Sequence, residues 1–203
     1  MARMSPTERR EAIVDAALAV ASRKGLASTT VRDVAAEMGT SSGLIHHYFD
    51  SMDEVLAAAF EKVAGADLSE TEAMLEGGDP RTMLAGFLRS YAPVGEDWAF
   101  PLWLDAWAEA ARRPVLREVS SRLNLGWAAL IERAIRAGIA DGTFRSEDPS
   151  AAAWRILSVI DGLALQVVAH GTILDRAHML AWAATAAERE LALPAGSLMA
   201  GGA

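Results

Sequence analysis

Apolar residues recur at helical spacing along most of the chain, in segments bounded by capping residues, glycines and prolines. Ser5, Pro6 and Glu8 form a capping pattern ahead of the first apolar stripe. Gly25 supplies a stop after that stripe. The same reasoning predicts helices over residues 30–38, 42–49, 51–76, 80–92, 98–112, 114–140, 149–170 and 175–191. No segment alternates as a strand does, so we expect an all-α protein of about nine helices.

The lengths of these segments divide the chain. Residues 1–50 hold three short helices and lead into a fourth, which indicates a small helical domain. Residues 51–195 hold the longer, more apolar helices and are predicted to form a larger bundle. Residues 196–203, rich in glycine and alanine, are predicted to be a disordered tail.

The amino-acid composition excludes several kinds of functional site. The chain has no cysteine, which excludes disulfides, thiolate metal sites and a cysteine nucleophile. The N-terminus shows no apolar signal-peptide core. The most apolar stretch, residues 151–170, contains Arg155, Asp161 and Gln166, which disfavours a membrane span. We therefore expect a cytoplasmic protein with no membrane partner and no cofactor.

The charge is unevenly distributed. The chain carries a net charge of −8, but residues 1–49 contain six Lys/Arg and five Asp/Glu, a net charge of +1. The remainder must then carry −9. Any nucleic-acid surface is therefore confined to the N-terminal quarter.

A short turn of Gly39, Thr40 and Ser41 separates the second and third predicted helices, which is typical of a helix-turn-helix. The third helix opens with small hydrogen-bonding residues beside unpaired backbone N–H groups, a site that suits phosphate. His46 and His47 are about 100° apart on a helix, so they are poor ligands for one metal ion. We expect them to contact DNA and expect no metal; solvated surface histidines are the alternative.

The segment TTVRDVAAEMGTSSGLIHHYFDSMDEVL resembles the signature of the TetR family of bacterial transcriptional repressors. Two positions depart from the family pattern: His46 replaces the usual tyrosine, and Met52 replaces the usual lysine. Arg3, Arg9 and Arg10 either follow the DNA backbone or the adjacent minor groove, or are solvated charges. The resemblance implies phosphate contacts from Thr29, Thr30, His47 and Tyr48, and base-facing contacts from Ser42, Gly43, Leu44 and His46. Thr40 and Ser41, at the start of the third helix, are expected to contact phosphate as well.

All six tryptophans lie between residues 98 and 182, in the predicted bundle. Ordinary core packing is one interpretation; an apolar effector pocket is the other. The segments LWLDAWAEAARRPVLREV and IDGLALQVVAHG resemble the choline/betaine-regulator subgroup, which favours the pocket. Asp105 and Glu109 are either polar anchors in it or helix-surface charges, and an acid-lined pocket would favour an apolar effector with a cationic group. The candidate effector-binding residues are Phe87, Trp98, Phe100, Trp103, Trp107, Asn124, Trp127 and Gln166.

The last two long helices, residues 151–170 and 177–191, are apolar on more than one face, so we expect another protein surface to pack against them. We expect them to pair with their copies in a homodimer. A two-fold dimer presents its recognition helices to half-sites of a pseudo-palindromic operator, roughly 34–36 Å apart. The expected interface residues are Trp154, Leu157, Asp161, Gly162, Leu165 and Val168.

These observations predict a sequence-specific DNA-binding repressor released by a small apolar effector. The alternative is a helical small-molecule-binding protein or enzyme without a DNA role. The sequence offers no nucleophile elbow, no histidine–carboxylate pair at ligand spacing and no glycine-rich phosphate loop, so we expect no enzyme.

Overall fold

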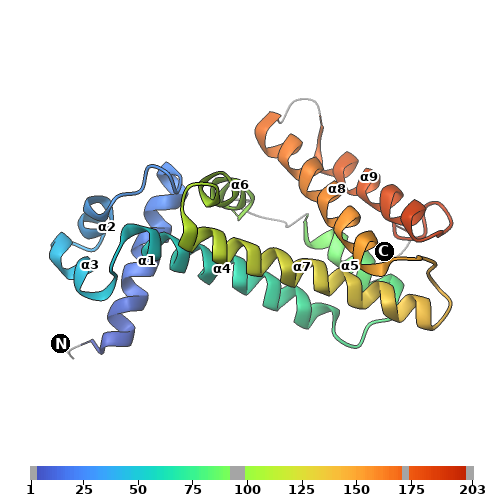
Figure 1. The fold of residues 1–203 in the computed structure, drawn as a ribbon. Coiled ribbons are helices and arrows are strands. Elements are labelled where there is room, and N and C mark those ends of the chain that lie inside the picture. Colours follow the sequence, from blue (N-terminus) through green and yellow to red (C-terminus); the bar gives the residue numbers. More distant parts are fainter. Residues whose placement is uncertain (1–3, 92–98, 171–173, 200–203) are drawn as a thin grey trace. The chain divides into compact units, whose positions relative to one another are not determined.

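The computed structural model describes residues 4–91, 99–170 and 174–199, and within them the chain forms α-helices and no strand (Figure 1). The predicted all-α fold is confirmed, and the predicted boundaries differ from the observed ones by at most two residues because capping residues mark most of them. The described helices are α1 (Pro6–Lys24), α2 (Val31–Glu37), α3 (Ser42–Tyr48), α4 (Met52–Leu75), α5 (Pro80–Ser90), α6 (Ala99–Ala110), α7 (Pro114–Ala140), α8 (Pro149–His170) and α9 (Arg176–Glu190).

The helices pack into two compact units. The first comprises Met1–Ala66 and Trp98–Leu123, and the second comprises Asp67–Asp97 and Asn124–Ala203. This division by packing differs from the division at residue 50, because α6 and the first turns of α7 pack with α1–α4. The long helices α4 and α7 each contribute to both units.

The core of the first unit joins α1, α2, α3 and the start of α4. Figure 1 shows α2 and α3 beside α1. Ile13, Val34, Ile45 and Val55 come from the four helices in turn and are each at most 1% exposed. Burial of such side chains contributes roughly 1.5–3 kcal/mol each, which fixes the short α2 and α3 that would be marginal alone.

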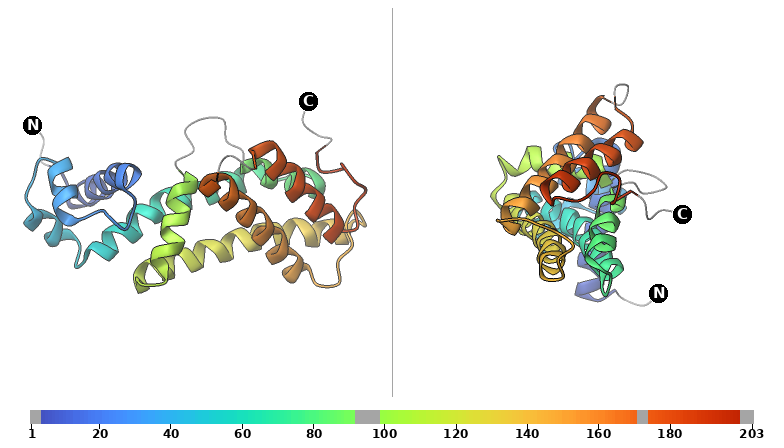
Figure 2. Two further views of the ribbon diagram at one scale, coloured as in Figure 1. Left: turned by 90° about the horizontal axis from the view of Figure 1, so that it is seen from above. Right: turned by 90° about the vertical axis from the view of Figure 1, so that its right-hand side faces the viewer.

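The second unit is built around α8 and α9, which run side by side in both views of Figure 2. Ile131 and Ile135 of α7, Phe87 of α5 and Ile160 of α8 are each at most 1% exposed in its core. Gly138 of α7 lies against the Phe144 ring, where an added Cβ would stand 2.3 Å from a ring carbon. The chain leaving α7 can therefore fold tightly back over that helix.

The segment after α9 differs from the expected disordered tail. Glu188 is 3% exposed, and its carboxylate accepts the backbone N–H groups of Gly196 and Leu198, each at 2.9 Å. Leu198 is 2% exposed. Residues 196–199 are thus held by a buried acid, which composition did not reveal; residues 200–203 of the predicted tail lie outside the described residues.

Candidate DNA interface and effector site

The segment from α2 to α3 forms a helix-turn-helix whose inner side is apolar. Thr30 caps α2 by accepting the Asp33 N–H at 3.3 Å. The turn passes through Gly39 at φ +62°, a left-handed conformation that favours glycine. Ile45 is 1% exposed and Phe49, directly after α3, is 2% exposed. Because these two side chains point into the core, as expected, the opposite side of α3 is left to solvent.

The outward side of α3 carries most of the residues expected to contact DNA. The Ser41 side chain makes no capping hydrogen bond, so its hydroxyl is available to another molecule. The rings of His47 and Tyr48 meet edge to face, with centroids 5.0 Å apart. Of the expected contact residues, Ser41, Gly43, His46 and His47 are exposed, and Thr40, Ser42, Leu44 and Tyr48 are half-buried.

Two threonines expected at phosphate are already engaged. Thr29 is 4% exposed, and its hydroxyl donates to the Gly25 carbonyl at 2.8 Å. It fixes the turn between α1 and α2, and we remove it from the candidate phosphate contacts. The Thr30 hydroxyl donates to Asp33 Oδ2 at 2.6 Å, but Thr30 is exposed at the start of α2 and stays a candidate.

Arg10, a candidate for the DNA backbone, is bound within the domain instead. Its guanidinium donates to the Tyr48 carbonyl at 2.7 Å, at the C-terminal end of α3. The same group lies 3.8 Å from the centroid of the Phe49 ring, a cation–π contact. Arg10 therefore braces the end of α3 against α1.

Other cations near the helix-turn-helix are paired with acids. Lys24 lies 2.8 Å from Asp33, and together with the Thr30 hydroxyl it lowers the pKa of Asp33 to about 2. Arg23 pairs with Glu37. Arg3 lies outside the described residues. Among residues 4–49, the two cations without a partner in the described part of the chain are Arg9 and Arg32.

Met52, at the position where a lysine is usual, packs against the core of the first unit. The Ser51 hydroxyl accepts the Glu54 N–H at 3.2 Å, and the Glu54 carboxylate accepts the Asp50 N–H at 3.1 Å. The predicted cap of α4 is confirmed. Its first turn is apolar and acidic, so any phosphate contact there depends on backbone N–H groups.

Asp105 of α6 binds the turn between α1 and α2. Its Oδ2 accepts the Leu26 N–H at 2.9 Å. Gly25, at φ +81°, lies so close that an added Cβ would stand 2.8 Å from the same oxygen. The carboxylate therefore satisfies a backbone donor within the first unit, and Asp105 is neither an effector anchor nor a plain surface charge.

Glu109, the other expected anchor, belongs to a polar network between α4, α6 and α7. It is 9% exposed and accepts the Arg113 Nε–H at 2.8 Å. Arg113 also pairs with Asp53 at the start of α4. The Arg113 guanidinium is the main cause of the lowered pKa of Glu109. Glu109 is therefore a structural acid that positions Arg113, which in turn pairs with Asp53 of α4.

The aromatic residues expected around an effector form two clusters in different units. In the first unit, the Trp103 ring meets Phe60 edge-on at 4.8 Å between centroids, and Trp107 lies 5.7 Å from Trp103. In the second unit, the Phe87 and Trp127 rings lie 6.0 Å apart. Each cluster is partly ordinary packing, since Phe60 and Phe87 are each at most 1% exposed.

The remaining expected effector residues have different surroundings. Phe100 and Asn124 are half-buried, and both have interactions within the chain. Gln166 is exposed on α8. Trp98 lies outside the described residues. The effector set as a whole stays a prediction.

The surface of α8 and α9 retains large apolar side chains. Trp154, Leu165 and Trp182 are 40%, 41% and 55% exposed. Leu157, by contrast, is 2% exposed, and Asp161 is bonded to Tyr91 of the same chain, so these two face inward and leave the expected interface set. Gly162 is exposed and Val168 is half-buried.

By length and composition alone, α8 is the one described helix that could cross a membrane, and 33% of its 18-residue apolar window is buried.

Comparison with known families decides the identity. Residues 13–59 match the model described as bacterial regulatory proteins, tetR family. Residues 80–192 match the model described as the C-terminal domain of BetI-type transcriptional repressors. The chain belongs to the TetR family. It is a DNA-binding transcriptional regulator, and the resemblance carried by residues 29–56 is confirmed.

Individual TetR-family relatives agree. The transcriptional repressor KstR2 of Rhodococcus jostii is 30% identical over 73% of this chain and 74% of the relative. A transcriptional regulator of Saccharomonospora viridis, solved in complex with choline, has a TM-score of 0.79 at 27% identity, covering 87% of this chain and 94% of that one. The multidrug binding protein EbrR complexed with ethidium has a TM-score of 0.68 at 25% identity, covering 90% and 98%.

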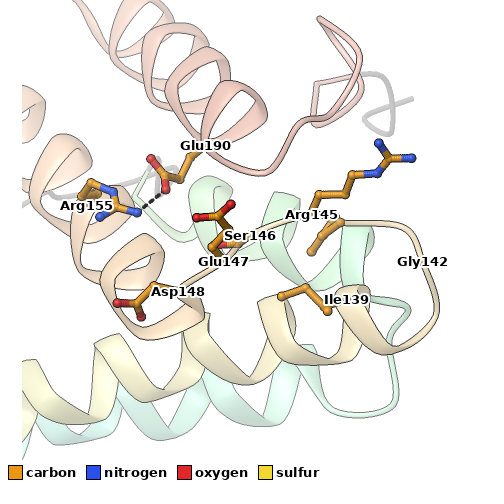
Figure 3. Close-up of a pocket in the computed structure, with 9 residues that line it drawn as sticks. Ile139, Gly142, Arg145, Ser146, Glu147, Asp148, Arg155 and Glu190 are labelled. Atoms are coloured by element: carbon orange, nitrogen blue, oxygen red, sulfur yellow. Dashed lines mark hydrogen bonds and ion pairs between the residues drawn. The ribbon is translucent and has the colours of Figure 1, made fainter.

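An open cleft of about 850 Å³ lies where α7 leads into α8 in this TetR-family chain (Figure 3). Arg155 and Glu190 form an ion pair on one side of it. Figure 3 shows Arg145 on the opposite side, with its guanidinium turned away from that pair. None of the residues expected to bind the effector lines this cleft. Its charged, open walls do not resemble an apolar effector pocket.

Sequence reasoning missed the residues that join α6 and α7 to the DNA-binding helices. Asp105 and Leu26 are 79 residues apart, and Arg113 and Asp53 are 60 apart. No local pattern marks such pairs, because each depends on the tertiary packing of distant helices. The nearest signal in the sequence is Gly25 itself, which was interpreted only as a helix stop and which adopts a φ of +81° beside Asp105.

Proposed function

We propose that this protein is a homodimeric repressor that binds a pseudo-palindromic operator and releases it when a small organic effector enters the C-terminal bundle. In this proposal it is a cytoplasmic protein, performs no enzymatic reaction and has no membrane partner. The family match supports the transcriptional role. The geometry of α3 supports the mode of DNA binding.

The observation that carries the proposal is the two-sided character of α3. Ile45 fixes the helix to the core, while Gly43, His46 and His47 are exposed on it. A recognition helix needs this arrangement, because side chains near its N-terminus must reach base edges while the helix itself stays rigid. Histidine can donate to and accept from base edges, and glycine lets the duplex approach closely.

We propose that a second copy of the chain packs against the exposed apolar side chains of α8 and α9. Trp154 and Leu165 of α8 and Trp182 of α9 are large apolar side chains that are each at least 40% exposed. A two-fold interface places the same patch on both subunits, so helices α8 and α9 can pair with their copies. Gly162, exposed on α8, permits close approach of the two backbones. The dimer then presents two α3 helices to the operator.

The solved relatives support an effector in the bundle. The regulator from Saccharomonospora viridis is in complex with choline, and EbrR is complexed with ethidium. If an effector binds better to a form of this chain that does not fit the operator, effector and DNA weaken each other's binding reciprocally. This linkage is the physical basis of the proposed release.

Operator binding tests the proposal directly. We would measure fluorescence anisotropy of the duplex immediately upstream of the reading frame, beside a scrambled duplex. Gly43→Ala is the sharpest variant, because an added Cβ meets nothing nearer than Ser41 Oγ at 3.7 Å, so the protein itself accommodates it. We expect a loss of roughly tenfold to hundredfold in operator affinity for Gly43→Ala and for His46→Ala. Gly65→Ala, at a glycine of α4 where an added Cβ meets nothing within 4 Å, is the matched control.

The alternative of a ligand-binding protein or enzyme without a DNA role predicts a different result. Gly43→Ala and His46→Ala would then be silent. Binding no tighter than to the scrambled duplex, together with an empty genome-wide pull-down, would favour that alternative.

A further inference from the structure

The first turns of α1 contribute one charged residue to the face of that helix that packs in the core. Arg10 precedes the buried Ile13 and Val14 by three and four residues, so it lies on the same side of α1. Its guanidinium donates to the Tyr48 carbonyl at 2.7 Å and lies 3.8 Å from the centroid of the Phe49 ring. Among the described residues no acid pairs with Arg10. Both of its contacts are therefore with the end of α3.

These two contacts hold the end of a helix that is too short to be stable alone. The helix α3 has seven residues, and its last carbonyl groups have no N–H partner further along it. Arg10 gives the Tyr48 carbonyl a donor, and its positive charge lies at the negative end of the helix dipole. The planar guanidinium also covers Phe49, which is 2% exposed. Without Arg10, the apolar contacts of Ile45 and Phe49 hold α3 on its inward side alone.

The end of α3 that Arg10 contacts also carries side chains that face solvent. The Tyr48 ring meets the His47 ring edge to face, with 5.0 Å between centroids, and His46 and His47 are exposed. A movement of the Tyr48 backbone therefore moves the His47 ring with it. Side chains that recognise a ligand must be held to within about 0.5 Å of the productive geometry. The contacts of Arg10 thus bear on base recognition, although its guanidinium is turned to the protein.

We propose that Arg10 is a positioning residue for operator recognition: it fixes the end of α3 so that His46 and the other exposed side chains of this helix meet the base edges. In this role Arg10 does not neutralise a phosphate. The assignment rests on the proposed operator binding. A phosphate contact strengthens binding to every duplex and increases its salt dependence, whereas correct placement of α3 strengthens binding to the operator alone. The two roles therefore give different results.

Fluorescence anisotropy over a series of salt concentrations tests which role Arg10 has. The probes are the duplex that the unaltered full-length protein selects from a random-sequence library and a scrambled version of that duplex. We expect Arg10→Gln to weaken binding to the selected duplex by roughly tenfold or more, and to change binding to the scrambled duplex by less than about threefold. The log–log slope of affinity against salt should stay the same.

Two further variants separate position from charge. Arg9→Gln is the matched control, because it removes the same charge from the neighbouring residue, whose side chain has no partner in the described part of the chain. It should change binding to both duplexes by the same factor, so the ratio of the two affinities stays constant. Arg10→Lys keeps the charge but has no planar group to cover Phe49. It should bind the selected duplex less tightly than the unaltered protein and more tightly than Arg10→Gln.

Amide hydrogen exchange followed by mass spectrometry tests the contact without DNA. Arg10→Gln should exchange several-fold faster than the unaltered protein over residues 42–49, because the end of α3 has lost its support. Exchange in α4 and α9 should stay the same, which also verifies that the variant is folded. Arg9→Gln should exchange like the unaltered protein throughout.

Three results would overturn the positioning role. The first is a salt slope that is flatter by about 2 for Arg10→Gln, which indicates one lost phosphate contact in each protomer of a dimer. The second is an equal loss of affinity for both duplexes. The third is unchanged exchange over residues 42–49.

The experiments also distinguish this proposal from the proposed function. If the protein selects a duplex and Arg10→Gln discriminates it equally well, the positioning role fails and the repressor proposal stands. If the unaltered protein selects no duplex from the library, the repressor proposal fails. Faster exchange over residues 42–49 in Arg10→Gln would then still show that Arg10 fixes α3.

Discussion

Asp161→Asn is expected to make the protein more stable at neutral pH. Burial raises the pKa of this carboxyl from an ordinary value of 3.8 to about 6. A raised pKa means that folding disfavours the ionised form. A tenfold change in an ionisation constant corresponds to about 1.36 kcal/mol, so the ionised acid costs at most about 3 kcal/mol at pH 7 and above. The asparagine side chain would carry no charge and could still accept the Tyr91 hydrogen bond.

The sign of the pH dependence follows from proton binding. Between the unfolded and folded pKa values, the native carboxyl holds more protons than the unfolded one. The free energy of unfolding of the unaltered protein therefore falls, on account of this group, as pH rises from about 4 to about 6. The stability difference between Asp161→Asn and the unaltered protein should be near zero below pH 4 and reach a plateau above pH 6.

We expect that plateau to be about 1–2 kcal/mol, because the half-buried carboxylate retains some solvent. Urea unfolding at several pH values measures the difference directly. Thermal unfolding should show a rise of roughly 2–4 °C for each kcal/mol in a chain of this length. Protein concentration must be equal throughout, because the proposed dimerisation would contribute to stability. Lower stability of Asp161→Asn than of the unaltered protein at neutral pH would refute the reasoning. A stability difference between the two that does not change with pH would also refute it.

Three further perturbations have defined expectations. Within residues 4–49, Arg9 and Arg32 are the two cations that have no partner in the described part of the chain. If each contacts a phosphate in both protomers, operator affinity should fall with salt at a log–log slope of about −4, and Arg32→Gln should flatten that slope by about 2, as measured by anisotropy. Asp105→Ala leaves the Leu26 N–H unpaired and should lower the free energy of unfolding by roughly 1–3 kcal/mol in urea titrations. Trp154→Glu places a charge on the exposed apolar face of α8 and should shift analytical ultracentrifugation from dimer to monomer.

Local chemistry explains why the helix boundaries were predictable. The capping box of Ser5 and Glu8 is present, with the Glu8 N–H donating to Ser5 Oγ at 3.2 Å. Pro80, Pro114 and Pro149 each open a helix as expected. These signals act within four residues, so the sequence carries them in full. The inward side of α3 was predictable for the same reason, since apolar spacing defines it.

The side-chain partners were not predictable, because they join distant segments. The carboxylate of Glu188 holds residues 196–198, where composition predicted disorder. Arg10 is braced against Phe49 rather than left for DNA. Asp161 was expected at a subunit interface because α8 is apolar all round. Only the position of Tyr91, 70 residues earlier, shows that it faces inward.

The contacts of α6 indicate how much free energy could couple a shift of this helix to the α1–α2 turn beside the helix-turn-helix. Trp103 packs on Phe60 of α4, while Asp105, two residues on, holds the Leu26 N–H beside the helix-turn-helix. A shift of α6 that moved Trp103 would therefore strain or break the hydrogen bond of Asp105. A hydrogen bond to a charged group contributes about 1.5–3 kcal/mol. Coupling free energies of about 1–3 kcal/mol change affinity by roughly 5- to 150-fold. One such bond is therefore enough to link a ligand-induced shift of α6 to the α1–α2 turn. Arg113, in the connection between α6 and α7, adds a second link through its ion pair with Asp53 of α4.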